Sequence, residues 1–65
     1  MVLVVKFGEK YLKNIDGFQV MEWTRDVRSA IKFNGQGASY ANQIADTYGA
    51  QVLRYDPSTG RVTAY

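Results

Sequence analysis

The chain has 65 residues, of which 46% are hydrophobic and 22% charged, a balance typical of a globular rather than a disordered protein. This length predicts a single domain, residues 1–65, near the lower size limit at which a hydrophobic core folds unaided. Cysteine and histidine are absent, which excludes disulfides, thiolate metal sites and the usual base at neutral pH. The net charge of +2 has the wrong sign for a protein that imitates DNA phosphates.

Targeting signals and membrane spans are not apparent in the sequence. The early apolar run over 2–5 is interrupted by Lys6 and Gly8 before it reaches the length of a signal peptide or a membrane helix. Together with the absence of cysteine, this pattern predicts a cytoplasmic protein that does not contact a membrane. The excess positive charge lies in residues 1–32, which hold six of the eight basic residues.

The first part of the chain predicts three antiparallel strands in a meander. The first strand alternates and is rich in valine, and because both of its faces are apolar at its start we expect it to be central in the sheet. Asp16-Gly17 is a typical two-residue hairpin signal, because both residues tolerate the positive φ of a type I′ turn. The predicted strands cover residues 1–7, 10–14 and 18–24.

Two helical segments are predicted next. Thr24 is a favourable N-cap for a short helical turn, whose apolar stripe would comprise Val27, Ala30 and Ile31. After a loop over 34–37, apolar residues recur at helical spacing from Ala38 to Tyr48, and Gly49 is well placed to end that helix in the left-handed conformation. The stripe of the main helix is rich in alanine, so we expect Ala41 and Ala45 to be its contacts with the sheet.

The last two strands are predicted over 51–55 and 61–65. Pro57 presets φ for a turn, and Gly60 supplies the positive φ that returns the chain to the sheet. The whole pattern predicts an α+β fold, an antiparallel β-β-β-α-β-β sheet with one main helix on one face. The opposite face has no second helix to cover it, so it is a candidate interface.

The sequence contains no recognisable arrangement of catalytic residues. The carboxylates are scattered over turns, caps and the polar helix face, and the serines lack a histidine base. Gly35-Gln36-Gly37 precedes a helix, but it lacks the spacing of the dinucleotide and phosphate-binding motifs. We therefore predict a protein that is not an enzyme and that needs neither a metal nor an organic cofactor.

Tyrosines are the first candidates for a binding surface. Five phenols are too many for so small a core to bury with satisfied hydroxyls, and tyrosine is enriched at protein interfaces. Tyr40 lies off the alanine stripe, Tyr65 ends the chain, and the uncovered sheet face adds three further candidates. The predicted partner-binding residues are Tyr11, Lys13, Tyr40, Arg54 and Tyr65.

Basic residues with interleaved aromatics suggest nucleic-acid binding as the alternative. An aromatic side chain flanked by cations can stack on a base while the cations follow the phosphate backbone. Trp23 would be such an aromatic, although a lone tryptophan in a small domain is more often part of the core. The residues predicted for this alternative are Lys10, Lys13, Arg25, Arg28 and Lys32.

A series of short motifs runs in order through nearly the whole chain. It comprises Tyr11-Leu12, Trp23-Thr24-Arg25-Asp26, Ala30, Phe33, then Ala38, Ala41 and Ala45 before Gly49-Ala50-Gln51-Val52. This series resembles a family of small uncharacterised phage and prophage proteins, in which a Tyr-Leu strand and a Trp-Thr strand precede an Ala-x-x-Phe step into a helix and a closing strand. The Asn34-Gly35-Gln36-Gly37 stretch departs from the family, which has a polar, helix-favouring run there.

The resemblance implies a setting rather than a mechanism. Small phage proteins without catalytic residues often bind and inhibit a host enzyme or defence complex, as anti-CRISPR proteins do. The leading hypothesis is therefore a phage-type inhibitor in the host cytoplasm that evades antiviral defence by blocking a surface of a host protein or protein complex. A homodimer is a further expectation, because Val62-Thr63-Ala64 carries no charge that would prevent strand pairing at a sheet edge.

Overall fold

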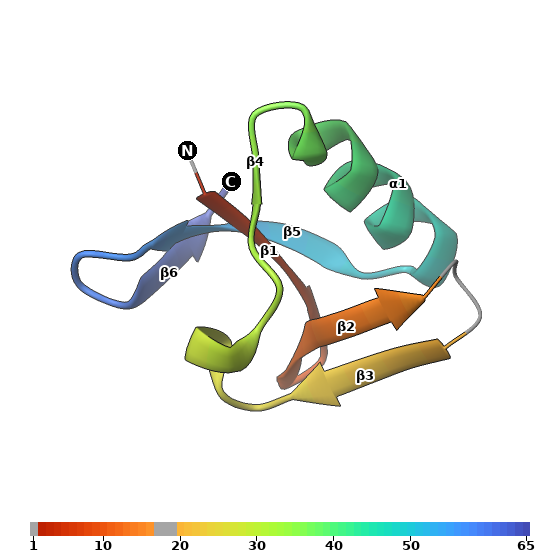
Figure 1. Cartoon of the computed structure of the whole chain (residues 1–65), viewed down its shortest axis with the longest axis horizontal. Coiled ribbons are helices and arrows are strands. Elements are labelled where there is room, and N and C mark those ends of the chain that lie inside the picture. Colours follow the sequence, from red (N-terminus) through yellow and green to blue (C-terminus); the bar gives the residue numbers. More distant parts are fainter. Residues whose placement is uncertain (1, 17–19) are drawn as a thin grey trace.

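The computed structural model describes residues 2–16 and 20–65, which form one antiparallel sheet with a helix packed against it (Figure 1). The strand order is β3-β2-β1-β5-β6, and β4 pairs with β1 beside this path. The α+β prediction is confirmed. The strands are β1 (Val2–Phe7), β2 (Lys10–Asp16), β3 (Val20–Thr24), β4 (Phe33–Asn34), β5 (Gln51–Asp56) and β6 (Arg61–Ala64), and the helices are η1 (Val27–Ser29), a 3₁₀ turn, and α1 (Gly37–Tyr48).

Strand β1 is the central strand, as its apolar sequence predicts. One edge of β1 pairs with β5 from Val2 to Lys6, and the other edge pairs with β2 near Phe7. The remainder of that second edge pairs with β4, where Leu3 lies opposite Phe33. Sequence patterning does not predict β4, because two residues are too few to show the alternation that identifies a strand.

The first face of the sheet, which we call the helix face, packs against α1. Its core comprises Leu3, Val5, Leu12, Phe33, Ala41 and Ile44. Ala41 and Ala45 are both buried, so the predicted contact residues of the helix are confirmed. The helix ends as expected at Gly49, which has φ 70° and donates its backbone N–H to the Ala45 carbonyl.

The opposite face, which we call the η1 face, is not left uncovered. Val4, Ala30 and Tyr55 form a second buried cluster, and Val27 of η1 packs against it. The expectation of an uncovered face is therefore wrong, because the segment after β3 crosses the sheet and supplies two apolar side chains. The expected stripe is divided as well, since Ile31 packs with the helix-face core.

The short helical turn begins later than predicted. Asp26, rather than Thr24, is the N-cap of η1, and its Oδ1 accepts the Arg28 backbone N–H at 3.0 Å. Thr24 Oγ1 instead accepts the Asp26 backbone N–H at 3.1 Å. Thr24 is the last residue of β3 and pairs with Tyr11, so its backbone remains in the sheet.

Hairpin geometry agrees with the prediction for β5 and β6. Gly60 has φ 74° and donates its N–H to the Asp56 carbonyl at 2.7 Å, while Asp56 Oδ1 accepts the Ser58 N–H at 2.9 Å. Strand β6 ends at Ala64 rather than at the final residue. The turn predicted at Asp16-Gly17 involves residues 17–19, which lie outside the described residues.

Candidate binding surface

A hollow of about 500 Å³ lies where β1 turns into β2. The pairing register explains how its residues meet: Phe7 lies opposite Lys10, and Trp23 lies opposite Leu12. Directly opposed residues of an antiparallel pair point to the same face, so Phe7, Lys10 and Trp23 all belong to the helix face. We call this region, lined by Phe7, Gly8, Glu9, Lys10, Trp23 and Arg25, the aromatic hollow.

Two aromatic rings form the apolar part of the aromatic hollow. Phe7 is 53% exposed, whereas Trp23 is half-buried and packs against the helix-face core. Their ring centroids are 5.9 Å apart at an interplanar angle of 50°, a favourable tilted arrangement. Trp23 therefore fixes one side of the Phe7 ring, and the rest of that ring is available to a ligand.

Charged side chains surround the two rings. Lys10 and Arg25 supply positive charge and Glu9 supplies one negative charge, and all three residues are exposed. In the described part of the chain none of the three has an ion-pair partner. The hollow can therefore hold an apolar group at its centre and an anionic group at its margin.

The five predicted partner-binding residues do not form one patch. Tyr11 is half-buried on the η1 face, with Lys6 Nζ 5.6 Å from its ring centroid. Tyr40, which is 36% exposed, lies on α1 and packs edge-on against Phe33 at 6.0 Å. Lys13 and Arg54 are exposed on β2 and β5.

Tyr65 is 56% exposed. Lys13 lies at a β-bulge, because the register of β2 with β3 shifts between Leu12 and Asn14.

The structure brings together two of the five predicted nucleic-acid contacts, Lys10 and Arg25, in the aromatic hollow. Arg28 is exposed on η1. Lys32 has a structural role instead. Its Nζ donates to the carbonyl oxygens of Val27, Arg28 and Ala30 at 2.7–2.8 Å and lies 5.0 Å from the Tyr55 ring centroid.

Phe7 is the residue that sequence reasoning misses. Alternation along β1 places it with Leu3 and Val5 on the helix face, which suggests a core residue. The usable signal is its position one residue before the Gly8-Glu9 turn. A tight turn there places Phe7 opposite Lys10, at the end of the sheet and beyond the best-covered part of β1.

The described residues include no group of three or more aspartate or glutamate side chains arranged to hold a metal ion. Neither helix in the described part of the chain has the length and apolar character needed to cross a bilayer. Comparison with known protein families, curated proteins and solved structures finds no match.

Proposed function

We propose that this chain is a small non-enzymatic binding module that attaches to a protein partner through the aromatic hollow. The observation that carries the proposal is the exposed Phe7 ring, which packs on Trp23 in a hollow that Lys10 and Arg25 also line. Exposing a large ring to water is unfavourable, and a partner that covers it gains the free energy of burying that apolar surface.

The composition of the hollow favours a protein over other ligands. Aromatic residues and arginine dominate the residues that contribute most to protein–protein affinity, whereas a phosphate backbone needs a continuous positive track. The hollow offers two cations, Lys10 on β2 and Arg25 after β3, rather than a row of cations that could follow a nucleic-acid strand, and the net charge of the chain is only +2. A partner surface with an apolar side chain next to an acidic one fits these charges.

The setting of this module is part of the proposal. Its resemblance to small phage and prophage proteins supports a role in the host cytoplasm, where it would block a functional surface of a host protein complex such as a defence complex. Blocking needs only a stable contact, and the proposed surface contains no group that must react.

Two exposed aromatic residues allow a matched test. Phe7 and Tyr65 are 53% and 56% exposed, so replacing either by alanine removes a similar exposed ring. Immobilised wild-type chain, Phe7→Ala and Tyr65→Ala would be incubated with nuclease-treated host lysate, and the retained proteins identified by mass spectrometry. We expect Phe7→Ala to lose, by at least about ten-fold, a protein that wild type and Tyr65→Ala retain.

Equal retention by all three proteins would show that the aromatic hollow is not the interface. Circular dichroism of each variant checks that Phe7→Ala still folds. A charge-reversal variant, Arg25→Glu, adds a second test, because a partner with an acidic margin should also be lost from it.

Single-stranded nucleic acid is a second candidate, favoured by one observation: Lys10 and Arg25 line the same hollow as the Phe7-Trp23 pair. Trp23 is the only tryptophan, so its fluorescence reports directly on the hollow. Titration with a 12-nucleotide thymidine or uridine strand should quench that fluorescence, with an affinity that falls steeply as salt is added. Quenching of this kind would replace the protein-partner proposal, particularly if nuclease treatment removes every retained protein.

A further inference from the structure

A second hollow, of about 450 Å³, lies at the other end of the sheet on the β5-β6 hairpin. The register there pairs Arg54 with Thr63 and Asp56 with Arg61. These four residues alternate with the buried Tyr55 and the half-buried Val62, so their side chains project from the helix face. We call this region, lined by Val2, Arg54, Tyr55, Asp56, Pro57, Arg61 and Thr63, the arginine hollow.

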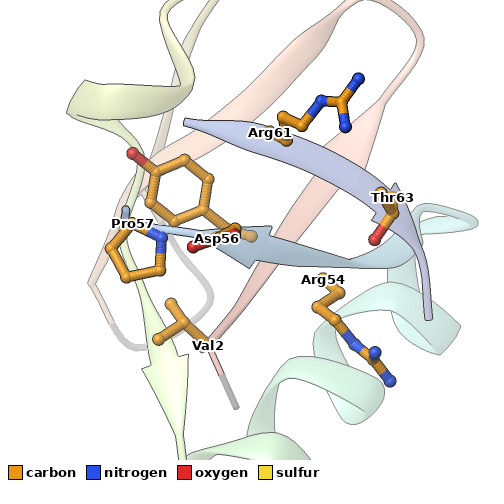
Figure 2. A pocket seen from close by; sticks show the side chains of 7 residues that line it. Val2, Arg54, Asp56, Pro57, Arg61 and Thr63 are labelled. Carbon is orange, nitrogen blue, oxygen red and sulfur yellow. The ribbon is translucent and has the colours of Figure 1, made fainter. Parts of the chain in front are cut away.

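Arg54 and Arg61 are diagonal neighbours on the two strands. Residues in that relationship have backbones roughly 7–8 Å apart, and long side chains readily span such a gap. Figure 2 shows the two guanidinium groups extending away from one another, with Thr63 on the strand beside them. Like charges without a counter-ion separate in this way, and exposed side chains change rotamer within nanoseconds.

Both arginines lack a counter-ion in the structure. Neither guanidinium has an ion-pair or hydrogen-bond partner within the described part of the chain. Asp56 lies opposite Arg61, but its Oδ1 accepts the Ser58 backbone N–H at 2.9 Å and so helps to form the turn. The two arginines outnumber the one carboxylate of the hollow, so its charged lining is net positive and attracts an anion.

We propose that the arginine hollow binds a ligand carrying two linked phosphate groups. A guanidinium presents a planar fork that matches a phosphate, so each arginine can hold one group of a diphosphate. The Thr63 hydroxyl adds a donor beside Arg54. A single phosphate contacts only one guanidinium, so we expect it to bind more weakly than a diphosphate that contacts both.

This site is independent of the aromatic hollow, because it lies around the β5-β6 hairpin and the start of β1 and shares no lining residue with it. Either proposal can therefore fail while the other stands. Free diphosphate and the diphosphate of a nucleotide present the same chemistry to the two arginines. Parallel titrations with pyrophosphate and adenosine diphosphate distinguish these two ligands.

The test is a titration of ¹⁵N-labelled protein with inorganic pyrophosphate, followed by NMR at constant pH and ionic strength. We expect saturable shifts at the Arg54 and Arg61 side-chain Nε–H groups and at the Thr63 amide. Inorganic phosphate should bind at least about five-fold more weakly, since it engages one guanidinium fork instead of two. Adenosine diphosphate in a parallel arm shows whether a nucleoside strengthens or weakens binding.

Single substitutions locate the site. Arg54→Gln and Arg61→Gln should each weaken pyrophosphate binding about five- to ten-fold, because each removes a charge-assisted pair. Arg28→Gln is the matched control: it removes the same charge from an exposed arginine on η1. Asp56→Asn keeps an oxygen for the Ser58 N–H and removes the negative charge, so it should tighten binding about two-fold.

Three outcomes would overturn the proposal. Shifts that do not saturate, or that sodium chloride at equal ionic strength reproduces, would show general screening. An equal loss of binding in Arg28→Gln would show attraction to net charge rather than to this hollow. Equal affinity for phosphate and pyrophosphate would exclude the two-fork arrangement.

Discussion

The two faces of the sheet are covered in different ways. On the helix face, the 12-residue helix α1 buries Ala41, Ile44 and Ala45 against β1 and its neighbours. On the η1 face, the cover is a three-residue 3₁₀ turn and the residues beside it, with Val27 and Ala30 as its apolar contacts. Figure 1 shows the long coil of α1 and, apart from it, the short yellow-green coil of η1.

The covers also differ in what holds them in place. A helix of three turns satisfies most of its own backbone hydrogen bonds, so apolar packing is sufficient to fix it on the sheet. The η1 segment is too short for that, and side chains satisfy its backbone: Asp26 at its start and the Lys32 ammonium at its end. In a small domain, a few polar contacts can thus replace a second helix.

The sharpest test of this difference uses two adjacent valines. Val4 and Val5 are both fully buried, but Val4 contributes to the η1-face cluster and Val5 to the helix-face core. We expect Val5→Ala to lower the free energy of unfolding by about 2.5 kcal/mol and Val4→Ala by about 1.5 kcal/mol. The rigid helix cannot collapse into the cavity, whereas the short η1 segment can move toward it.

Urea denaturation followed by circular dichroism gives both values. The chemical change and the strand are the same for the two variants, so the difference reports on the cover alone. A larger loss in Val4→Ala than in Val5→Ala would show that η1 is the more rigid cover and would reverse the comparison.

Lys32 provides the next test, because its ammonium holds the end of η1. Lys32→Met retains an apolar stem of similar length and removes three hydrogen bonds to carbonyl oxygens. We expect a loss of about 2 kcal/mol in the free energy of unfolding, since the ammonium carries a charge and its hydrogen bonds to Val27 and Ala30 are partly buried. Hydrogen exchange should accelerate at Ala30 well before it does in α1.

Lys13→Met is the control for that substitution. Lys13 is exposed at the bulge of β2 and has no directly opposed residue on β3, so its replacement should change stability by less than about 0.5 kcal/mol. If the two methionine variants were equally stable, the contacts of Lys32 would contribute nothing to holding η1.

The sequence predicts the parts of the fold that depend on local patterns, and it misses those that depend on contacts between distant residues. Periodic features are predicted: the valine-rich alternation of β1, the alanine stripe of α1 and the Gly60 turn. Features that depend on distant residues are not. Asp26 displaces Thr24 as the N-cap because Thr24 is held in the sheet opposite Tyr11, and β4 exists because it fills the edge of β1 that β2 leaves open.

Candidate binding residues are harder to predict, because a binding surface depends on which residues become neighbours. The sequence identifies Lys10 and Arg25 as candidate cations of a binding surface. It does not show that Phe7, at the end of β1, lies in the same hollow. Lys32 illustrates the opposite error, since a lysine beside a short helical turn suggests a free charge. Its ammonium instead donates to three carbonyl oxygens of the five residues before it, which belong to η1 and the residue that follows η1.

The smallest expected effect concerns the start of η1. Asp26→Ala removes the acceptor of the Arg28 N–H and should lower the free energy of unfolding by about 1 kcal/mol. Asp26→Asn should lower it by only about 0.3 kcal/mol, because asparagine caps a helix almost as well as aspartate. Urea denaturation of both variants measures the difference. Equal losses would mean that the carboxylate acts through its charge rather than through its hydrogen bond. The η1 face would then depend on electrostatics, and added salt would weaken it more than the helix face.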